Sequence, residues 1–182
     1  MGVTHPATLV VVLAGRCDRC GFEPDKWTDA AAIRELDTMS ERWPPVVTGV
    51  AEVDLGRRLV RDTWSIAEYV DHVRETMFVM RFLLEVAGDG PEVDLGAIGE
   101  PTFDAEPRRI DSSQAMQALW DEVHQLCARL DEVAAALWDA SVVLGGRRVD
   151  VHWIVRNALH ECSHHLGDVS RLREIALTEP AP

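Results

Sequence analysis

Hydrophobic residues recur every three to four positions along most of the chain, which is the period of an amphipathic α-helix. Four segments show this period. The first begins after Trp27, with Thr28 or Asp29 as its N-cap. We expect it to end or kink at Pro44 and Pro45, because proline removes a helical hydrogen bond.

The second segment has the best-defined start, since Ser65-Ile66-Ala67-Glu68 has the pattern of a capping box. In a capping box, the Ser65 hydroxyl accepts from the backbone N–H of Glu68, and the Glu68 carboxylate accepts from that of Ser65. The apolar period continues to Gly88, where a helix stop is expected.

The third segment starts near Asp111 or Ser112, and its apolar stripe predicts a helix that ends between Trp138 and Ala140. Glycine and proline are frequent between positions 88 and 110. That stretch is therefore expected to be a long crossover or a loop beside an active site.

The fourth segment follows Gly145-Gly146, which suit a turn. Asp150 is the expected N-cap of a helix that continues to about Leu177. The four helices predict an all-α fold, a four-helix bundle over residues 28–182, preceded by a short cysteine-containing extension over residues 1–27.

Composition limits the partners of this bundle. A chain of 182 residues with 47% apolar content suits one core. With 31 acidic and 18 basic residues, its net charge of -13 repels nucleic acid and anionic lipid alike. No stretch approaches the roughly 20 apolar residues of a membrane span. We expect neither nucleic-acid nor membrane partners, and the sequence leaves open whether the protein is a monomer or a homodimer.

The apolar run Ala7 to Gly15 raises the question of a signal peptide. No basic residue precedes it, and Arg16 stands where a lipoprotein cysteine should directly follow the small residues. We interpret the run as a short strand, an ordered arm or a poorly packed tail. The protein is expected to be cytoplasmic, with its four cysteines mostly reduced.

Two histidines in the fourth helix have the spacing of a metal chelate. His160 and His164 are four residues apart, so both rings leave one face of the helix. His72, in the middle of the second helix, is the best candidate for a third ligand. Three imidazoles leave coordination positions open, which is the arrangement of catalytic sites.

The less specific interpretation is that these histidines are hydrogen-bonded packing residues, as single mid-helix histidines such as His72 usually are. Two uncompensated imidazoles on an apolar face are costly, which favours metal binding for the pair. His165 lies roughly 100° further round the helix, so we place it beside the ligands or at an interface. Cys162 should point elsewhere.

Two acids are candidate catalytic residues. Glu68 precedes His72 by four positions and Asp168 follows His164 by four, so each lies on a ligand-bearing face. Either can orient an imidazole or act as a general base. Alternatively, Glu68 only completes its capping box, and Asp168 only forms a surface pair with Arg171 or Arg173.

Cys17 and Cys20 have the C-x2-C spacing of half a zinc site. The second half is missing from the sequence, so closure would require scattered ligands such as His5, Cys127 or a partner chain. A structural zinc site, a reducible disulfide and an unpaired loop pair all remain open.

Two motifs resemble the DinB superfamily: Trp64 to His72, with the sequence WSIAEYVDH, and Leu159 to Asp168, with the sequence LHECSHHLGD. The resemblance covers roughly residues 28 to 177. It implies an up-down-down-up bundle with a zinc or nickel ion on three histidines, here His72, His160 and His164.

The wider superfamily includes mycothiol-dependent maleylpyruvate isomerases and thiol S-transferases. An arginine-rich chain with Lys26 as its single lysine fits an actinobacterial source, where mycothiol is the available thiol. The resemblance thus implies an enzyme that activates a low-molecular-weight thiol for transfer to a small electrophile, or for isomerisation. A metal-dependent hydrolase and a non-catalytic metal-binding stress or regulatory module are the alternatives. Trp64, Trp120 and Trp153 either line the substrate pocket or are ordinary core aromatics.

Overall fold

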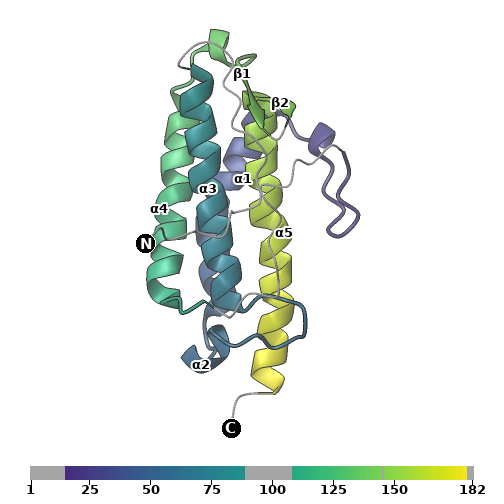
Figure 1. Cartoon of the computed structure of the whole chain (residues 1–182), viewed down its shortest axis with the longest axis vertical. Coiled ribbons are helices and arrows are strands. Elements are labelled where there is room, and N and C mark those ends of the chain that lie inside the picture. Colours follow the sequence, from purple (N-terminus) through teal and green to yellow (C-terminus); the bar gives the residue numbers. More distant parts are fainter. Residues whose placement is uncertain (1–14, 89–107, 145, 180–182) are drawn as a thin grey trace.

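The structure is a computed structural model that describes residues 15–88, 108–144 and 146–179. Four long helices pack side by side in it (Figure 1): α1 (Asp29–Val47), α3 (Ile66–Gly88), α4 (Ser112–Asp131) and α5 (Val151–Thr178). The smaller elements are α2 (Glu52–Leu55), two 3-10 turns (Pro24–Lys26 and Ala135–Leu137) and a hairpin of β1 (Ser141–Leu144) and β2 (Arg147–Asp150). The predicted all-α four-helix bundle is confirmed.

Helices α1 and α5 run parallel to each other. Asp29, at the start of α1, accepts a 3.1 Å hydrogen bond from Arg156 near the start of α5, and Thr48, just after α1, accepts from Arg173 near the end of α5. Helices α3 and α4 run in the opposite direction (Figure 1). This is the up-down-down-up order that the family resemblance implied. The predicted crossover between α3 and α4 falls mainly on positions 89–107, outside the described residues.

The long helices begin where the sequence predicted. Thr28, Asp111 and Asp150 each accept a hydrogen bond from a backbone N–H in the first turn of α1, α4 and α5, respectively. At α3, the Ser65 N–H donates to Glu68 at 2.8 Å and the Glu68 N–H donates to the Ser65 hydroxyl at 3.2 Å. The capping box is therefore complete in both directions.

Two helix ends differ in detail from the prediction. Helix α1 passes through Pro44 and Pro45 and ends within one turn of them, where the Thr48 N–H donates to the Pro44 carbonyl at 3.2 Å. Helix α4 ends at Asp131, short of the predicted Trp138 to Ala140. Its apolar stripe misled the prediction, because the apolar residues after the helix belong to a 3-10 turn and to β1.

The hairpin was not predicted, although its signals are present in the sequence. Val142, Leu144 and Val149 are buried, while the other residues of the two strands are partly or largely exposed, so burial alternates as in a half-buried hairpin. Gly146 in the turn has a φ of +75°, which favours glycine. The hairpin closes one end of the bundle and leads directly into α5 (Figure 1).

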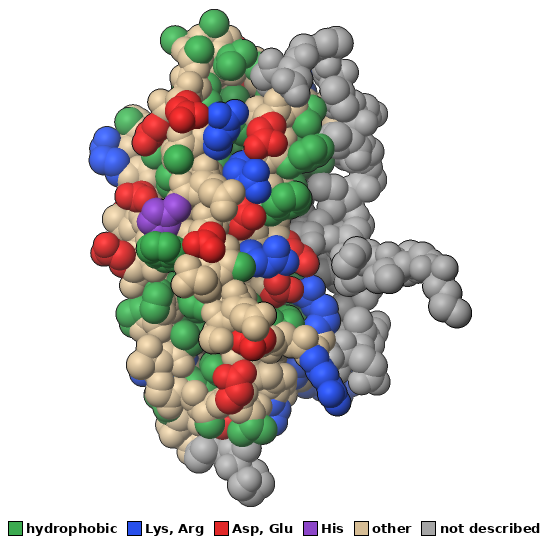
Figure 2. Space-filling view, turned by 90° about the vertical axis from the view of Figure 1, so that its left-hand side faces the viewer, with side chains coloured by type: hydrophobic (Ala, Val, Ile, Leu, Met, Phe, Trp, Pro, Cys, Tyr) green, Lys and Arg blue, Asp and Glu red, His purple; other side chains and the backbone are tan. Residues whose placement is uncertain are grey.

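The surface shown in Figure 2 mixes acidic, basic and hydrophobic side chains rather than presenting one sign of charge. Three large apolar side chains on α3 and α4 are substantially exposed, namely Phe78, Phe82 and Trp120. Within the described part of the chain, every helix is too short or too polar to cross a membrane.

The described part of the N-terminal extension lies against α5. Phe22 stacks on Trp27, with ring centroids 6.1 Å apart, and packs against the His160 ring of α5 at 5.3 Å. Because Phe22 contacts His160, the neighbouring Cys17 and Cys20 lie close to the histidines of α5.

Candidate metal centre

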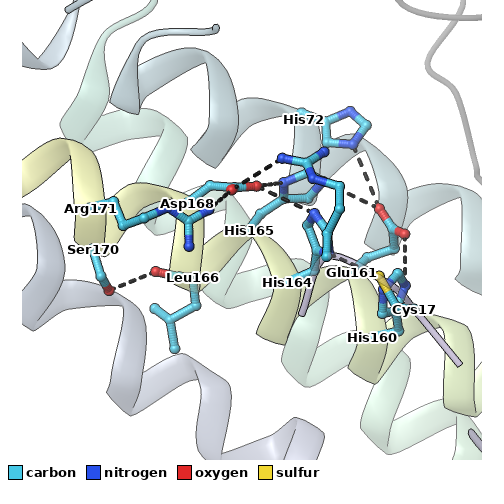
Figure 3. Close-up of polar contacts among 11 residues, drawn as sticks. Cys17, His72, His160, Glu161, His164, His165, Leu166, Asp168, Ser170 and Arg171 are labelled. Atoms are coloured by element: carbon cyan, nitrogen blue, oxygen red, sulfur yellow. Dashed lines mark hydrogen bonds and ion pairs between the residues drawn. The ribbon is translucent and has the colours of Figure 1, made fainter. Parts of the chain in front are cut away.

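Helix α5 carries two ligand pairs that are offset by one residue. His160 and His164 form the first pair, Glu161 and His165 form the second, and each pair is spaced by one helical turn. The offset of one residue is a rotation of about 100° around the helix. The two pairs therefore leave adjacent sides of α5 (Figure 3). Both sides are enclosed: His160, Glu161 and His164 are buried, and His165 is nearly so.

The second pair meets His72 of α3. The Oε2 atom of Glu161 lies 3.7 Å from His72 Nε2 and 3.5 Å from His165 Nε2. The three ligand atoms all lie within 4.8 Å of one another. Ligands of a tetrahedral zinc ion are about 3.4 Å apart for oxygen and nitrogen, so the observed separations suit one bound ion.

Glu161 is the charged member of this group. Burial favours its neutral form, but hydrogen bonds from His160, His165 and His72 outweigh burial and hold the pKa well below its usual value. Burial lowers the pKa of His72, although Glu161 opposes that shift. An ionised carboxylate therefore faces a neutral imidazole, and these are the protonation states in which both bind metals.

The first pair faces the cysteines of the extension. Ligand atoms of Cys17, Cys20, His160 and His164 all lie within 4.8 Å of one another, and Cys17 Sγ is 3.5 Å from His164 Nδ1. Burial raises the pKa of the Cys17 thiol, but the backbone N–H of Cys20 and the neighbouring His160 ring favour the thiolate and lower the pKa to about 7. Burial and the neighbouring His165 lower the pKa of His164 to about 4, which keeps this ring neutral.

Asp168 lies next to both groups. It accepts from His165 Nδ1 at 2.9 Å, and its Oδ2 is 3.5 Å from His164 Nε2. Arg171 and Arg19 form ion pairs with its other oxygen (Figure 3 labels the first of these). Asp168 therefore has the contacts that both predicted roles require: it can orient His165 and His164, and it forms an ion pair with Arg171.

The Glu68 carboxylate accepts hydrogen bonds from residues outside both ligand groups. Its carboxylate accepts from the Ser65 N–H, from Arg58 at 2.9 and 2.7 Å, and from the Arg108 N–H at 3.3 Å. Burial raises its pKa, but these donors, led by Arg58, lower it to about 2. This arrangement favours the capping alternative over a catalytic role for Glu68.

The predicted ligands His72, His160 and His164 do not form one group in the described structure. His160 and His164 face Cys17 and Cys20, whereas His72 faces Glu161 and His165. Glu161 was overlooked in the sequence, and His165 was placed beside the ligands rather than among them. The signal was available, because Glu161 and His165 have the same four-residue spacing as the histidine pair.

The other candidates from the sequence are not among the ligand groups of the described residues. His5 is outside the described residues, and Cys127 is buried on α4, where burial raises its thiol pKa to about 12. Cys162 points into the core as predicted, with its Sγ 3.7 Å from the Met77 sulfur.

Aromatic rings cover one side of the His72 group. The Trp64 ring lies 4.8 Å from the His72 ring, and the Tyr69 ring lies 5.2 Å from the His165 ring. Trp120 is exposed on α4, whereas the Trp153 indole nitrogen is buried. Of the three predicted tryptophans, Trp64 is the one whose ring contacts a ligand histidine.

The donor atoms fit transition metals. Imidazole, thiolate and carboxylate donors suit zinc and its neighbours, whereas calcium and magnesium prefer oxygen alone. Within the described residues, His160 Nε2 is a buried atom with no hydrogen-bond partner, although its Nδ1 lies 3.1 Å from Glu161. A buried nitrogen with a free lone pair is what a bound metal would satisfy.

The comparisons with known proteins agree with this architecture. The family model of the DinB superfamily matches residues 35–169. One solved structure, described with the words "YfiT from Bacillus subtilis is a probable metal-dependent hydrolase with an unusual four-helix bundle topology", is similar with a TM-score of 0.67. The similarity covers 84% of this chain and 86% of that one at 12% sequence identity, so it supports the fold. No curated protein matches the sequence.

Proposed function

The chain belongs to the DinB superfamily, and from this premise we propose that it is a metal-dependent enzyme whose divalent cation is held by His72, Glu161 and His165. The observation that carries the proposal is the convergence of two imidazole nitrogens on one oxygen of a buried carboxylate, at 3.5 and 3.7 Å. The described residues around Glu161 include no arginine or lysine within ion-pair distance of it, so histidines alone compensate its charge.

Three protein ligands leave a coordination position free for a substrate. Two histidines with one glutamate are a common ligand set of catalytic zinc, whereas structural zinc has four protein ligands. Zinc is the metal we favour, with nickel as the alternative, since both accept imidazole and carboxylate donors.

Neighbouring residues prepare the three ligands. Asp168 accepts from His165 Nδ1, so a cation that displaces the proton of His165 Nε2 would meet the lone pair of that nitrogen beside Glu161. His160 Nδ1 is 3.1 Å from Oε1 of Glu161, which leaves Oε2 for the metal. Carboxylates that fix a ligand histidine in this way raise its basicity and hold its orientation.

A bound divalent cation supplies a Lewis acid that lowers the pKa of a thiol or of water and polarises a substrate. Our first candidate for the nucleophile is a low-molecular-weight thiol of the mycothiol type, which would be transferred to a small electrophile or would promote its isomerisation. The superfamily resemblance supports this candidate. Trp64 and Tyr69 supply an apolar wall that would exclude water beside His72 and His165.

Water is the second candidate for the nucleophile, in which case the protein is a hydrolase. The description of YfiT as a probable metal-dependent hydrolase favours this alternative. The same three ligands serve both reactions, so the geometry of the metal group does not separate them.

Metal content tests the site first. We expect tag-free parent protein, measured by inductively coupled plasma mass spectrometry, to lose one equivalent of divalent metal in His72→Ala. The matched control is His124→Ala, because His124 lies on α4 and packs against the exposed Trp120 ring. An unchanged metal content in His72→Ala would contradict the proposed site.

Activity assays test the reaction. Metal-loaded parent protein is incubated with a panel of electrophiles in the presence and absence of mycothiol or glutathione, and with esters and amides alone. Metal-dependent thiol consumption supports the transferase, and thiol-independent cleavage supports the hydrolase. Inactivity of the metal-loaded protein across the whole panel would refute turnover and leave a metal-binding module.

A further inference from the structure

Four zinc-type donors converge where the N-terminal extension crosses α5. Two thiols come from Cys17 and Cys20, and two imidazoles come from His160 and His164 (Figure 3 shows three of the four residues). We propose that these four residues bind a second, structural zinc ion, which fastens the extension to α5. This inference does not depend on the chemistry proposed for His72, Glu161 and His165.

The backbone of the extension is folded in a way that points both thiols to one side. The Cys17 N–H donates to the Phe22 carbonyl and the Gly21 N–H donates to the Cys17 carbonyl, both at 2.8 Å. Gly21 has a φ of +75°, which a side chain would strain. This tight turn supplies the half site whose second half could not be identified in the sequence.

The two histidines supply the second half. Cys17 Sγ lies 3.5 Å from His164 Nδ1, close to the separation of about 3.6 Å expected for sulfur and nitrogen ligands of a tetrahedral zinc ion. His160 Nε2 is buried with no hydrogen-bond partner in the described structure. A zinc ion at the centre of the four donors would give that nitrogen its missing partner.

Each histidine turns its other nitrogen toward a carboxylate. His160 Nδ1 lies 3.1 Å from Glu161, and His164 Nε2 lies 3.5 Å from Asp168. Carboxylate, histidine and zinc in this order are the usual surroundings of a protein zinc ligand. The arrangement selects the tautomers that leave a lone pair for the metal at His160 Nε2 and His164 Nδ1.

The charge balance also suits zinc. Binding replaces the thiol protons of Cys17 and Cys20, which pass to solvent, and the two thiolates then neutralise the divalent ion while both imidazoles stay neutral. Four protein ligands close the coordination sphere, as in structural zinc sites. The ion would order the extension rather than take part in a reaction.

The proposed zinc ion is also coupled to the His72 group. Glu161 contacts His160 through one oxygen and His72 through the other, and Asp168 contacts both His164 and His165. These two carboxylates connect the groups directly. Zinc at the cysteines would therefore hold Glu161 and Asp168 in the orientation that the second group requires.

The test compares three variants of the full-length protein purified under reducing conditions. Cys20→Ser should lose one equivalent of zinc and weaken zinc binding by at least about 100-fold, since a ligand is worth more than a residue that only supports one. Cys20 is exposed, so this change is compatible with the fold, which circular dichroism would check. Cys127→Ala, which removes a buried thiol that belongs to none of the groups of converging donor atoms, should keep both equivalents.

Cobalt reports the ligands directly. Cobalt-loaded parent and His72→Ala should show the ultraviolet charge-transfer absorption of a cobalt thiolate, and Cys20→Ser should lack it. A zinc content equal in Cys20→Ser and parent, a cobalt spectrum without thiolate absorption, or a Cys17–Cys20 disulfide found by peptide mapping would overturn the inference. If only His72→Ala loses metal, the zinc site at the cysteines is refuted and the proposed enzyme site is supported. If only Cys20→Ser loses metal, the zinc site at the cysteines is supported and the proposed enzyme site is refuted.

Discussion

At the scale of single residues, two buried glutamates illustrate how the partners of a carboxylate decide its use. Glu68 accepts from Arg58 and from two backbone N–H groups, which are donors that always carry a hydrogen. Glu161 faces imidazoles, whose nitrogens can exchange a proton for a metal. The first carboxylate is fixed in a structural role, and the second is available for coordination.

Replacing Glu68 by Gln should lower the free energy of unfolding by about 2 kcal/mol at pH 7, because charged hydrogen bonds to Arg58 are lost. The pKa of Glu68 is lowered from 4.5 to about 2 in the folded protein. The ionised group therefore stabilises the fold above about pH 4.5, and this contribution disappears as the pH falls toward 2. Urea denaturation of parent and Glu68→Gln between pH 7 and pH 3 should show the difference shrinking.

Glu35→Gln is the control for this series. Glu35 pairs with Arg42 on the exposed surface of α1, where an ion pair contributes about 0–1 kcal/mol. Equal effects of the two substitutions at pH 7, or a difference that grows in acid, would refute the structural role of Glu68.

At the scale of elements, the helix starts were predictable and the end of α4 was not. Ser65 and Asp150 cap through their own side chains, so a few neighbouring letters of sequence determine where α3 and α5 begin. The end of α4 is set by packing, because the apolar residues after Asp131 pair in a hairpin instead of prolonging the helix. In a sequence, a short strand whose residues alternate between buried and exposed is difficult to distinguish from the continuation of an amphipathic helix.

The candidate metal groups show the same division between local and long-range information. The four-residue spacing of His160 and His164 predicts a shared helix face, and His72 on α3 does reach α5, although its partners are Glu161 and His165. The pairing of Cys17 with His164 joins positions 147 residues apart, and no local pattern encodes that. Only the packing of the extension on α5 reveals it.

The hairpin offers a prediction on backbone strain. Gly146→Ala should lower the free energy of unfolding by about 1 kcal/mol, because φ is +75° there and no atom lies within 4 Å of an added Cβ, so the cost is the backbone's alone. Thermal and urea unfolding measure this change. Gly56→Ala is the control, since Gly56 has a φ of -88° and equally open surroundings, and it should be neutral or slightly stabilising. Indistinguishable stabilities of the two variants would contradict the left-handed turn.

At the scale of the whole molecule, the extension and α5 connect the beginning and the end of the chain. Phe22 packs on His160, and Arg19 forms an ion pair with Asp168, so the extension rests on the same stretch of α5 that carries both ligand pairs. The order of the extension should therefore follow metal binding.

Limited proteolysis measures that order. Trypsin should cleave zinc-loaded parent protein slowly after Arg16, Arg19 and Lys26, and addition of a chelator should accelerate these cleavages at least about tenfold, because the extension is released when zinc leaves. In Cys20→Ser, the chelator should make no difference to cleavage in the extension. Equal rates for the parent with and without chelator would show that zinc does not hold the extension.

The proposed zinc ion, with Cys17 and His164 among its ligands, would also determine how the molecule responds to mechanical load. Tension applied to the two ends of a zinc-loaded chain would pass from position 17 to position 164 across the metal ligands, which are in direct contact. Helices α1, α3 and α4 lie within the closed loop and would carry no force. Only the last turns of α5 would peel away at first, and the bundle would stay intact until a coordinate bond breaks.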